Sequence, residues 1–389
     1  MSAAVGDGGP ADRTGVAVLG STGSIGTATL RVLARHADRF ALRAVTAHHN
    51  ARLLAAQVEA FAPRYVGLTE AGTVEGAAPE WCRGADVLRA AATHPGVHTV
   101  VNAVVGAAGL DATLAALQSG RRVALANKET LVMAGPLVRA VAAAGGGELV
   151  PVDSEHSAIL QCIAGRPGQA VRRLIITASG GPFRTWDAGR LAQATVHDAL
   201  QHPTWSMGRK ITVDSATLAN KALEVIEAHE LFGVPYDRID VVVHPQSVVH
   251  SMVEFVDGSV LAQLGAPTME VPILYALTHP ERTPDAALPP FDPVAHGRLD
   301  FEPVRADAFP MLGLGVDAGR AGGAAPAVYN AANEAAVAGF LDGRLSFGQI
   351  PVAVAAALDA LAGEAGDTLD ALRAADAAAR RHVRDRLAR

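Results

Sequence analysis

Three glycines spaced three residues apart constrain the fold of this chain more than any other feature. Gly20, Gly23 and Gly26 follow the apolar run 16–19 and open a helical stretch that we expect to reach about His36. Glycines at such a turn let the backbone approach a pyrophosphate, and the helix N-terminus offers it free N–H groups. The pattern predicts a dinucleotide-binding turn; the alternative is a tight turn that binds no ligand.

Strands and helices are expected to alternate from residue 15 to residue 152. Further strands are predicted at 40–46, 65–66, 98–104, 122–126 and 148–152, and helices at 51–61, 109–119 and 129–144. Such alternation is typical of βαβ units and a parallel sheet. We therefore predict an α/β fold that starts with a Rossmann-like dinucleotide-binding domain over residues 15–152.

The remainder of the chain has different patterns. Residues 153–282 carry expected strands at 173–178, 240–244, 248–256 and 259–264, a helix at 214–230 and a loop at 197–210. Asp257 and Gly258 are a hairpin signal between the last two strands. We predict a central α+β catalytic domain at 153–282, a proline-rich linker at 283–309 and a C-terminal α-helical bundle of three or four helices at 310–389. Residues 1–14 are predicted to be a disordered tail.

The end of the second expected strand bears on the choice of dinucleotide. Proteins that bind NAD place a carboxylate there to hold the ribose 2′-hydroxyl. Residues 46–52 contain no carboxylate and carry His48, His49 and Arg52 instead. This composition favours the 2′-phosphate of NADPH; a surface loop with incidental histidines is the alternative.

Three carboxylates have the placement of metal ligands. Asp153 and Glu155 follow an expected strand, and residues i and i+2 of an extended segment point the same way. Glu224 shares one face of an expected helix with Asn220 and Lys221. An all-oxygen ligand set suits Mg²⁺ or Mn²⁺. From spacing alone, solvated carboxylates and an N-capping aspartate before a helix are the simpler interpretation.

Charge and cysteine content narrow the class of protein. The formal net charge of −6 argues against a general nucleic-acid binder. The two cysteines, Cys82 and Cys162, lie far apart and fit a reducing compartment better than a disulfide scaffold. No apolar run reaches the ~18 residues of a membrane span, and residues 1–14 lack the apolar region of a signal peptide. We expect a cytoplasmic protein without nucleic-acid or membrane partners.

Ten short strings occur in a fixed order along the chain. They are GSTGSIG at 20–26, ANKE at 126–129, PVDSEH at 151–156, SGGPF at 179–183, HPxWSMGRK at 202–210, VDSAT at 213–217, NKxLE at 220–224, HPQS at 244–247, QLG at 263–265 and NAANE at 330–334. Together they resemble the 1-deoxy-D-xylulose 5-phosphate reductoisomerase family from about residue 15 to the C-terminus. The resemblance implies an enzyme that uses NADPH and a divalent metal to rearrange and reduce this phosphorylated sugar to 2-C-methyl-D-erythritol 4-phosphate, in the non-mevalonate isoprenoid pathway.

The resemblance also assigns roles to single positions. It implies metal ligands at Asp153, Glu155 and Glu224, which together with Lys128 form the implied catalytic set. The implied substrate contacts, including four that hold the phosphate and two in a mobile lid, are Ser154, Glu155, Ser179, His202, Trp205, Ser215, Asn220, Lys221 and Glu224. The implied cofactor contacts are Ser21, Thr22, Gly23, Ser24, Ile25, His49, Asn50, Asn127, Glu129 and Gly208. His250 matches an active-site histidine, with a satisfied core histidine as the alternative.

One position departs from the family pattern. His49 stands where the family often has lysine or arginine, so a weaker preference for NADPH is expected here. The resemblance implies a homodimer as well. Two other functions remain open at this point: a metal-independent NAD(P)H dehydrogenase, and a non-catalytic dinucleotide-sensing protein that would need neither a lid nor a phosphate cluster.

Overall fold

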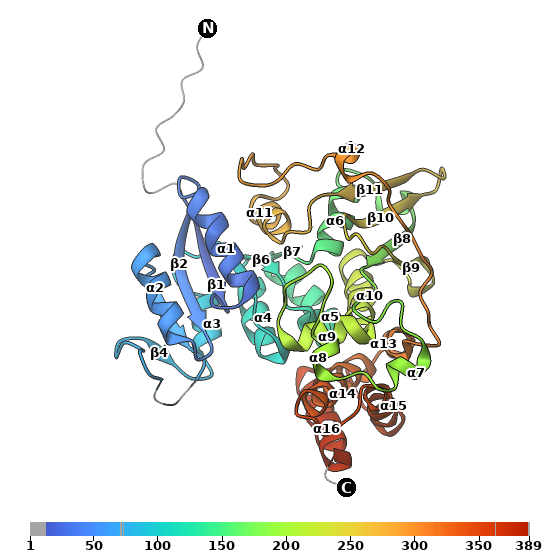
Figure 1. The fold of residues 1–389 in the computed structure, drawn as a ribbon. Coiled ribbons are helices and arrows are strands. Elements are labelled where there is room, and N and C mark those ends of the chain that lie inside the picture. Colours follow the sequence, from blue (N-terminus) through green and yellow to red (C-terminus); the bar gives the residue numbers. More distant parts are fainter. Residues whose placement is uncertain (1–12, 71, 73, 362, 388–389) are drawn as a thin grey trace. The chain divides into compact units, whose positions relative to one another are not determined.

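The computed structural model describes residues 13–70, 72, 74–361 and 363–387 (Figure 1). The chain forms two compact units. The first contains the described residues of Met1–Asn127, Val141–Val152 and Met269–Asp285, and the second those of Lys128–Ala140, Asp153–Thr268 and Ala286–Arg389. Most of the predicted tail lies outside the described residues, and its last residue, Thr14, already belongs to a strand.

A seven-stranded parallel sheet organises the first unit, as the alternating pattern predicts. Its strands are β1 (Thr14–Leu19), β2 (Phe40–Ala47), β3 (Tyr65–Leu68), β4 (Cys82–Arg83), β5 (Thr99–Asn102), β6 (Arg122–Leu125) and β7 (Glu148–Pro151), in the order β4-β3-β2-β1-β5-β6-β7. The strand order reverses beside β1, so the carboxyl end of β1 lies at the switch point where such sheets bind ligands.

Five helices belong entirely to the first unit: α1 (Ser24–Arg35), α2 (Ala51–Phe61), α3 (Val87–Ala92), α4 (Leu110–Gln118) with the 3₁₀ turn Gly106–Gly109 before it, and α11 (Glu270–Thr278). Helix α11 comes from a distant part of the chain. Its Glu270 pairs with Arg31 and Arg35 of α1, both at 2.7 Å. Together with the buried side chains of Ile273, Leu274 and Leu277, these ion pairs connect residues 269–285 with the first unit, although we predicted them within a domain at 153–282 and the start of the linker.

A four-stranded sheet organises part of the second unit. Its strands are β8 (Val171–Ala178), β9 (Ile239–Val243), β10 (Val249–Phe255) and β11 (Val260–Leu264), in the order β11-β10-β8-β9. The predicted hairpin at Asp257 and Gly258 joins the antiparallel strands β10 and β11. Helices α6 (Ser154–Ile163) and α10 (Ala219–Phe232) share an apolar core with β8, β9 and β10, and the short 3₁₀ turns Gly168–Ala170 and Tyr236–Arg238 connect elements nearby.

The predicted single helix at 214–230 is wrong. The structure has α9 (Arg209–Thr217) and α10, separated at Leu218, whose φ of 62° is left-handed. Leu218 is only 3% exposed, so burial of its side chain holds the break in place. The predicted loop at 197–210 is also shorter, because α8 (Val196–Ala199) occupies its start and follows α7 (Ala188–Leu191).

The C-terminal helices are α13 (Pro310–Ala321), α14 (Ala325–Leu341), α15 (Gln349–Leu361) and α16 (Leu369–Leu387), in line with the predicted bundle. Figure 1 shows α14, α15 and α16 packed side by side. Their core continues into α9, α10 and the start of α5 (Lys128–Gly145), which is why they form one unit with the small sheet. The region predicted as a linker contains the short α12 (Pro293–His296).

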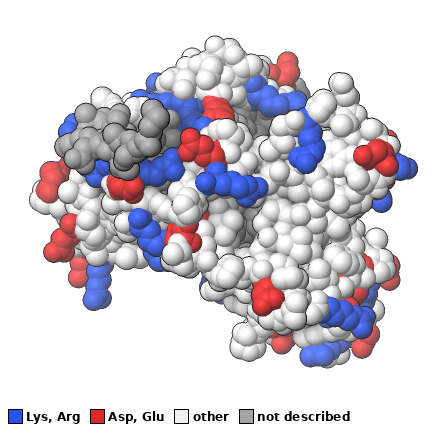
Figure 2. Space-filling view, turned by 90° about the horizontal axis from the view of Figure 1, so that it is seen from above, with Lys and Arg blue, Asp and Glu red and all other residues white. Residues whose placement is uncertain are grey.

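Within the described part of the chain, no helix combines the length and the apolar character needed to span a membrane. On the face seen in Figure 2, acidic and basic side chains are interspersed and separated by wide uncharged areas.

Candidate active site

The three predicted metal ligands meet in the second unit. One carboxylate oxygen each from Asp153, Glu155 and Glu224 lies within 4.8 Å of the others. The extended geometry that we predicted for Asp153 and Glu155 is wrong, because α6 begins at Ser154 and Glu155 lies in its first turn. Asp153 occupies the N-cap position, but its carboxylate makes no capping hydrogen bond to a described residue and contacts Lys128 instead. The N-cap interpretation therefore does not account for this side chain.

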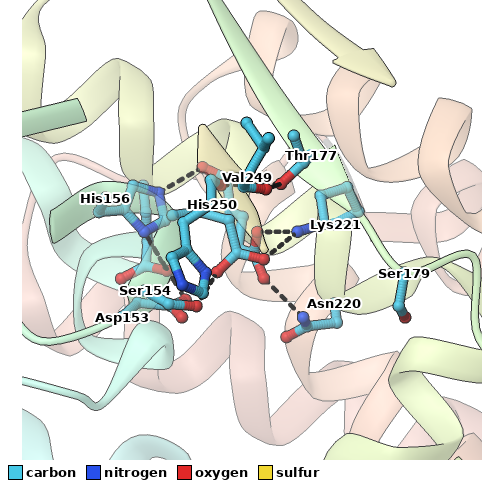
Figure 3. Close-up of polar contacts among 12 residues, drawn as sticks. Asp153, Ser154, His156, Thr177, Ser179, Asn220, Lys221, Val249 and His250 are labelled. Atoms are coloured by element: carbon cyan, nitrogen blue, oxygen red, sulfur yellow. Dashed lines mark hydrogen bonds and ion pairs between the residues drawn. The ribbon is translucent and has the colours of Figure 1, made fainter. Parts of the chain in front are cut away.

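Two ammonium groups accompany the carboxylates. Lys128 at the start of α5 contacts Asp153 and lies 3.1 Å from Glu224. Lys221 contacts Glu224 and lies 2.7 Å from Glu155. Figure 3 shows Asn220 and Lys221, from one turn of α10, pointing toward the carboxylates, and Asn220 donates to Glu224 at 2.6 Å.

The charges of this cluster are strongly coupled. Burial would lower the pKa of Lys128, but the surrounding carboxylates, Asp153 first, raise it well above its usual value. Burial and the charge of Glu155 raise the pKa of Glu224. Glu224 is buried, and Asp153 and Glu155 are partly exposed. This set of three carboxylates, all oxygen donors, fits a hard divalent cation such as Mg²⁺ or Mn²⁺, whose charge would stabilise the ionised form of Glu224.

Sequence reasoning left out a histidine and a glutamate behind the cluster. The fully buried His156 has its Nε2 atom 2.9 Å from the carbonyl oxygen of Glu224, and its Nδ1 atom lies 3.6 Å from Asp153 and 3.9 Å from Glu227. Burial opposes the charge of His156, but Glu227 and Asp153 raise its pKa to about 9. The i, i+3 spacing of both residues from metal-ligand candidates is a signal that could have found them.

Two of the four predicted phosphate contacts, Ser179 and Ser215, lie on either side of one glycine, whereas Asn220 and Lys221 contact the carboxylates described above. Ser179 follows β8 and accepts a hydrogen bond from the backbone of Gly181 at 3.2 Å. Gly181 has a φ of +65°, and a Cβ atom there would lie 2.7 Å from the carbonyl oxygen of Ser215. The glycine thus lets the Ser179 turn approach Ser215 on α9.

His202 connects the predicted lid to this turn. Its Nδ1 atom accepts hydrogen bonds from the backbone N–H groups of Thr204 (3.1 Å) and Trp205 (2.9 Å). The proton of the neutral ring is therefore on Nε2, which lies 3.0 Å from the Ser179 hydroxyl. Burial lowers the pKa of His202 to about 4, in agreement with a neutral ring. The Trp205 ring lies 6.5 Å from the ring of His250, which is buried on β10.

The glycine-rich turn of the first unit has the expected shape. A Cβ atom at Gly26 would lie 2.3 Å from the carbonyl oxygen of Gly20, so this close approach requires glycine. No carboxylate lies in the first turn of α1, and its N-cap residue is Gly23, which has no side chain to cap the helix. The N-terminal N–H groups of this helix fit an anionic ligand, as a dinucleotide pyrophosphate would be.

The other predicted cofactor residues have varied surroundings. The Ser21 hydroxyl donates to the side-chain oxygen of Gln57 at 2.6 Å. Asn50 is the N-cap of α2, and its side-chain oxygen accepts a hydrogen bond from the backbone N–H of Leu53. Asn127 donates to the carbonyl oxygens of Val104 (2.8 Å) and Gly106 (2.9 Å). Glu129 and Gly208 belong to the second unit, where Glu129 lies 3.1 Å from Lys210 and Gly208 precedes α9.

The two histidines after β2 differ in their contacts. His48 lies 2.8 Å from the Thr69 hydroxyl and 3.8 Å from Glu70, and the exposed His49 packs edge-on against its ring. Both rings are exposed, and the side chain of His49 makes no hydrogen bond or ion pair to a described residue.

Comparisons with known proteins agree along nearly the whole chain. Family models described as 1-deoxy-D-xylulose 5-phosphate reductoisomerase match residues 16–135, and models of the C-terminal domains of the same enzyme match 149–232 and 264–382. A reductoisomerase of this name from Gloeobacter violaceus is 50% identical over 380 residues, with 95% of this chain and 96% of the relative covered. One from Xanthomonas oryzae pv. oryzae is 51% identical over 375 residues, with 94% of each chain covered.

Solved structures give the same result. The Zymomonas mobilis reductoisomerase in complex with NADPH superposes with a TM-score of 0.89 at 42% identity, covering 96% of this chain and 99% of the other. A reductoisomerase in complex with NADPH, fosmidomycin and magnesium gives a TM-score of 0.90 at 38% identity, with 96% and 98% covered. This chain therefore belongs to the 1-deoxy-D-xylulose 5-phosphate reductoisomerase family.

Proposed function

We propose that this protein converts 1-deoxy-D-xylulose 5-phosphate to 2-C-methyl-D-erythritol 4-phosphate with NADPH and a divalent cation, a step of the non-mevalonate isoprenoid pathway. The observation that carries the proposal is the convergence of Asp153, Glu155 and Glu224 in a chain about half identical to named reductoisomerases. A metal-independent dehydrogenase would have no use for this acidic set.

Asp153, Glu155 and Glu224 would hold the cation, which when bound supplies Lewis acidity toward substrate oxygens. Lys128 and Ser154 border these carboxylates, so their ammonium and hydroxyl groups are placed to contact substrate hydroxyls. His156 and Glu227 lie behind the ligands and would fix their orientation.

The substrate phosphate would be held by Ser179, Ser215, Asn220 and Lys221. Hydroxyl, amide and ammonium donors together suit a dianion. Binding at a group remote from the reacting carbons supplies orientation for the chemical steps. The lid segment with His202 and Trp205 would exclude water from the reacting carbonyl.

NADPH would be bound by the glycine-rich turn, including Ser21, Thr22, Gly23, Ser24 and Ile25, and by the other predicted cofactor contacts: His49, Asn50, Asn127, Glu129 and Gly208. The cofactor supplies the hydride, and the protein sets its position. His49 can accept a hydrogen bond or, when protonated, pair with the 2′-phosphate, but it is a weaker partner than arginine.

The protein is also proposed to be a cytoplasmic homodimer. Strand β11 is an edge of its sheet and exposes Val260 (48%) and Leu261 (37%) near the exposed Val256 (67%). Apolar edge strands are surfaces that natural proteins usually cover. Light scattering of the wild type and of V260K tests the dimer. We expect a dimeric wild type and a monomeric V260K, and a monomeric wild type would contradict the proposal.

The two free cysteines fit a reducing compartment, which supports the proposed cytoplasmic location.

A direct assay tests the proposed activity. Purified protein is incubated with 1-deoxy-D-xylulose 5-phosphate, NADPH and Mg²⁺, and the absorbance of the reduced cofactor is followed with and without EDTA. Oxidation that requires both substrate and metal is expected. Oxidation that survives complete metal removal would favour a plain dehydrogenase.

A further inference from the structure

The basic residues of this chain are distributed very unevenly between two types. Of 33 lysines and arginines, only Lys128, Lys210 and Lys221 are lysine. The other 30 are arginine. Lysine differs from arginine in having a compact ammonium group. Carboxylate oxygens from several residues can approach this single nitrogen from different sides. Two of the three lysines contact the metal-ligand candidates, and the third has no role in the function proposed above.

Lys210 lies between two carboxylates. Its Nζ atom is 3.1 Å from Glu129 and 2.9 Å from Asp214, whose side chains are 8% and 1% exposed. Burial would lower the pKa of Lys210, but Asp214 and Glu129 raise it, so the group is charged. An arginine would place a larger planar group where a single nitrogen now meets both acids.

The C-terminal helices hold one of these carboxylates. Asn333 of α14 is fully buried and donates to the second oxygen of Asp214 at 2.8 Å. The next residue, Glu334, is paired with Arg380 of α16 at 2.7 Å. Asp214 is therefore oriented from two sides, by Lys210 within α9 and by Asn333 from α14.

The ends of this network lie beside the active-site segments. Glu129 directly follows Lys128, the lysine that contacts the metal-ligand candidates. Lys210 is the second residue of α9, and the N-cap of this helix, Gly208, ends the segment that carries the predicted lid residues His202 and Trp205. An ion pair with buried carboxylates contributes little net stability compared with apolar packing, and in some proteins such pairs fix the relative position of the elements that carry them.

We propose that Lys210 is a positioning residue that fixes the start of α5, with Lys128, relative to the end of the lid, through Glu129 and through Asp214 as oriented by Asn333. This inference rests on the proposed reductoisomerase function. It predicts that the geometry of the reacting groups depends on a lysine that need not touch the substrate.

The test compares K210M, K210R and the control R380K. Arg380 of the second unit also lies between two carboxylates, those of Glu334 and Asp376, both at 2.7 Å. R380K therefore exchanges arginine for lysine, the reverse of K210R, at a position outside the predicted lid. For each variant kcat, the KM for 1-deoxy-D-xylulose 5-phosphate and NADPH, the thermal midpoint, and its rise with Mg²⁺ are measured. The thermal data report folding and metal binding separately from turnover.

Both Lys210 variants are expected to lose about tenfold to a hundredfold in kcat, because small displacements of reacting groups have effects of this size. The Mg²⁺-induced rise should persist, the KM for the sugar phosphate should change by less than about threefold, and R380K should match the wild type within about twofold. A fully active K210R would show that a guanidinium group serves as well as the ammonium group of Lys210, and this would overturn the proposal. The K210R result decides the question even if K210M fails to fold. A folded K210M at the wild-type rate overturns it as well. A wild type without turnover would refute the proposed function itself, and the positioning role with it.

Discussion

The Nδ1 atom of His202 lies 2.9 Å from the backbone nitrogen of Trp205, while its Nε2 atom faces the Ser179 hydroxyl at 3.0 Å. One ring thus shapes the lid turn and contacts the predicted phosphate site. The two functions can be separated, because asparagine places its amide oxygen near the position of Nδ1, whereas glutamine places a donor near that of Nε2.

H202N should keep the lid turn and lose the contact to Ser179 and the phosphate. Its KM for the sugar phosphate should rise about tenfold, the size of one lost hydrogen bond to a charged group, with a smaller effect on kcat. H202Q should lower kcat more than it raises KM. Steady-state kinetics of both variants checks the division, and equal effects on both parameters in both variants would refute it.

E224Q removes a carboxylate from the predicted metal site. Activity should fall by at least about a hundredfold, since even indirect partners of a metal ligand are worth 10–100-fold. Mg²⁺ should raise the thermal midpoint of the wild type and not that of E224Q, because ligands that bind only the folded state stabilise it. E230Q is the matched control, as Glu230 is a buried carboxylate of the same helix that pairs with Arg139. A normal rate for E224Q would rule out the metal assignment.

Gly181 and Gly233 allow a comparison of two glycines with the same φ of +65°. Alanine at either costs about 1–2 kcal/mol of left-handed strain. Only at Gly181 would the new Cβ meet the carbonyl oxygen of Ser215, whereas nothing lies within 4 Å at Gly233. G181A should therefore raise the KM for the sugar phosphate about tenfold, and G233A should not. Thermal unfolding and kinetics measured together distinguish strain from loss of the site.

H49R should strengthen the preference for NADPH. Arginine pairs with a 2′-phosphate through two parallel hydrogen bonds and keeps its charge at every working pH. The ratio of kcat/KM for NADPH to that for NADH should rise about tenfold. An unchanged ratio would mean that residue 49 does not face the 2′-phosphate.

Local patterns predicted the parallel sheet well, because apolar strands buried on both faces carry a strong signal. They did not predict the packing of residues 269–285, which brings Glu270 to Arg31 and Arg35, more than 200 positions away in the chain. The break at Leu218 had no local signal either, since neither glycine nor proline marks it; the leucine is buried there, and the backbone N–H of Ala219 donates to the Thr217 hydroxyl.

The candidate site was predicted by position better than by geometry. The convergence of Asp153 and Glu155 was predicted, but as an extended pair rather than the N-cap and first turn of α6. His156 was missed although it lies three residues after Asp153, because a histidine on an apolar helix face is usually a core residue. Lys210 was missed because its contact with Glu129, 81 positions away in the chain, exists only in the folded protein.

The most direct test of the account is identification of the product by NMR after incubation with 1-deoxy-D-xylulose 5-phosphate, NADPH and Mg²⁺. We expect the branched 2-C-methyl-D-erythritol 4-phosphate, formed only when both NADPH and the cation are present. A straight-chain reduced sugar phosphate would show a dehydrogenase without rearrangement and would contradict the role assigned to Asp153, Glu155 and Glu224.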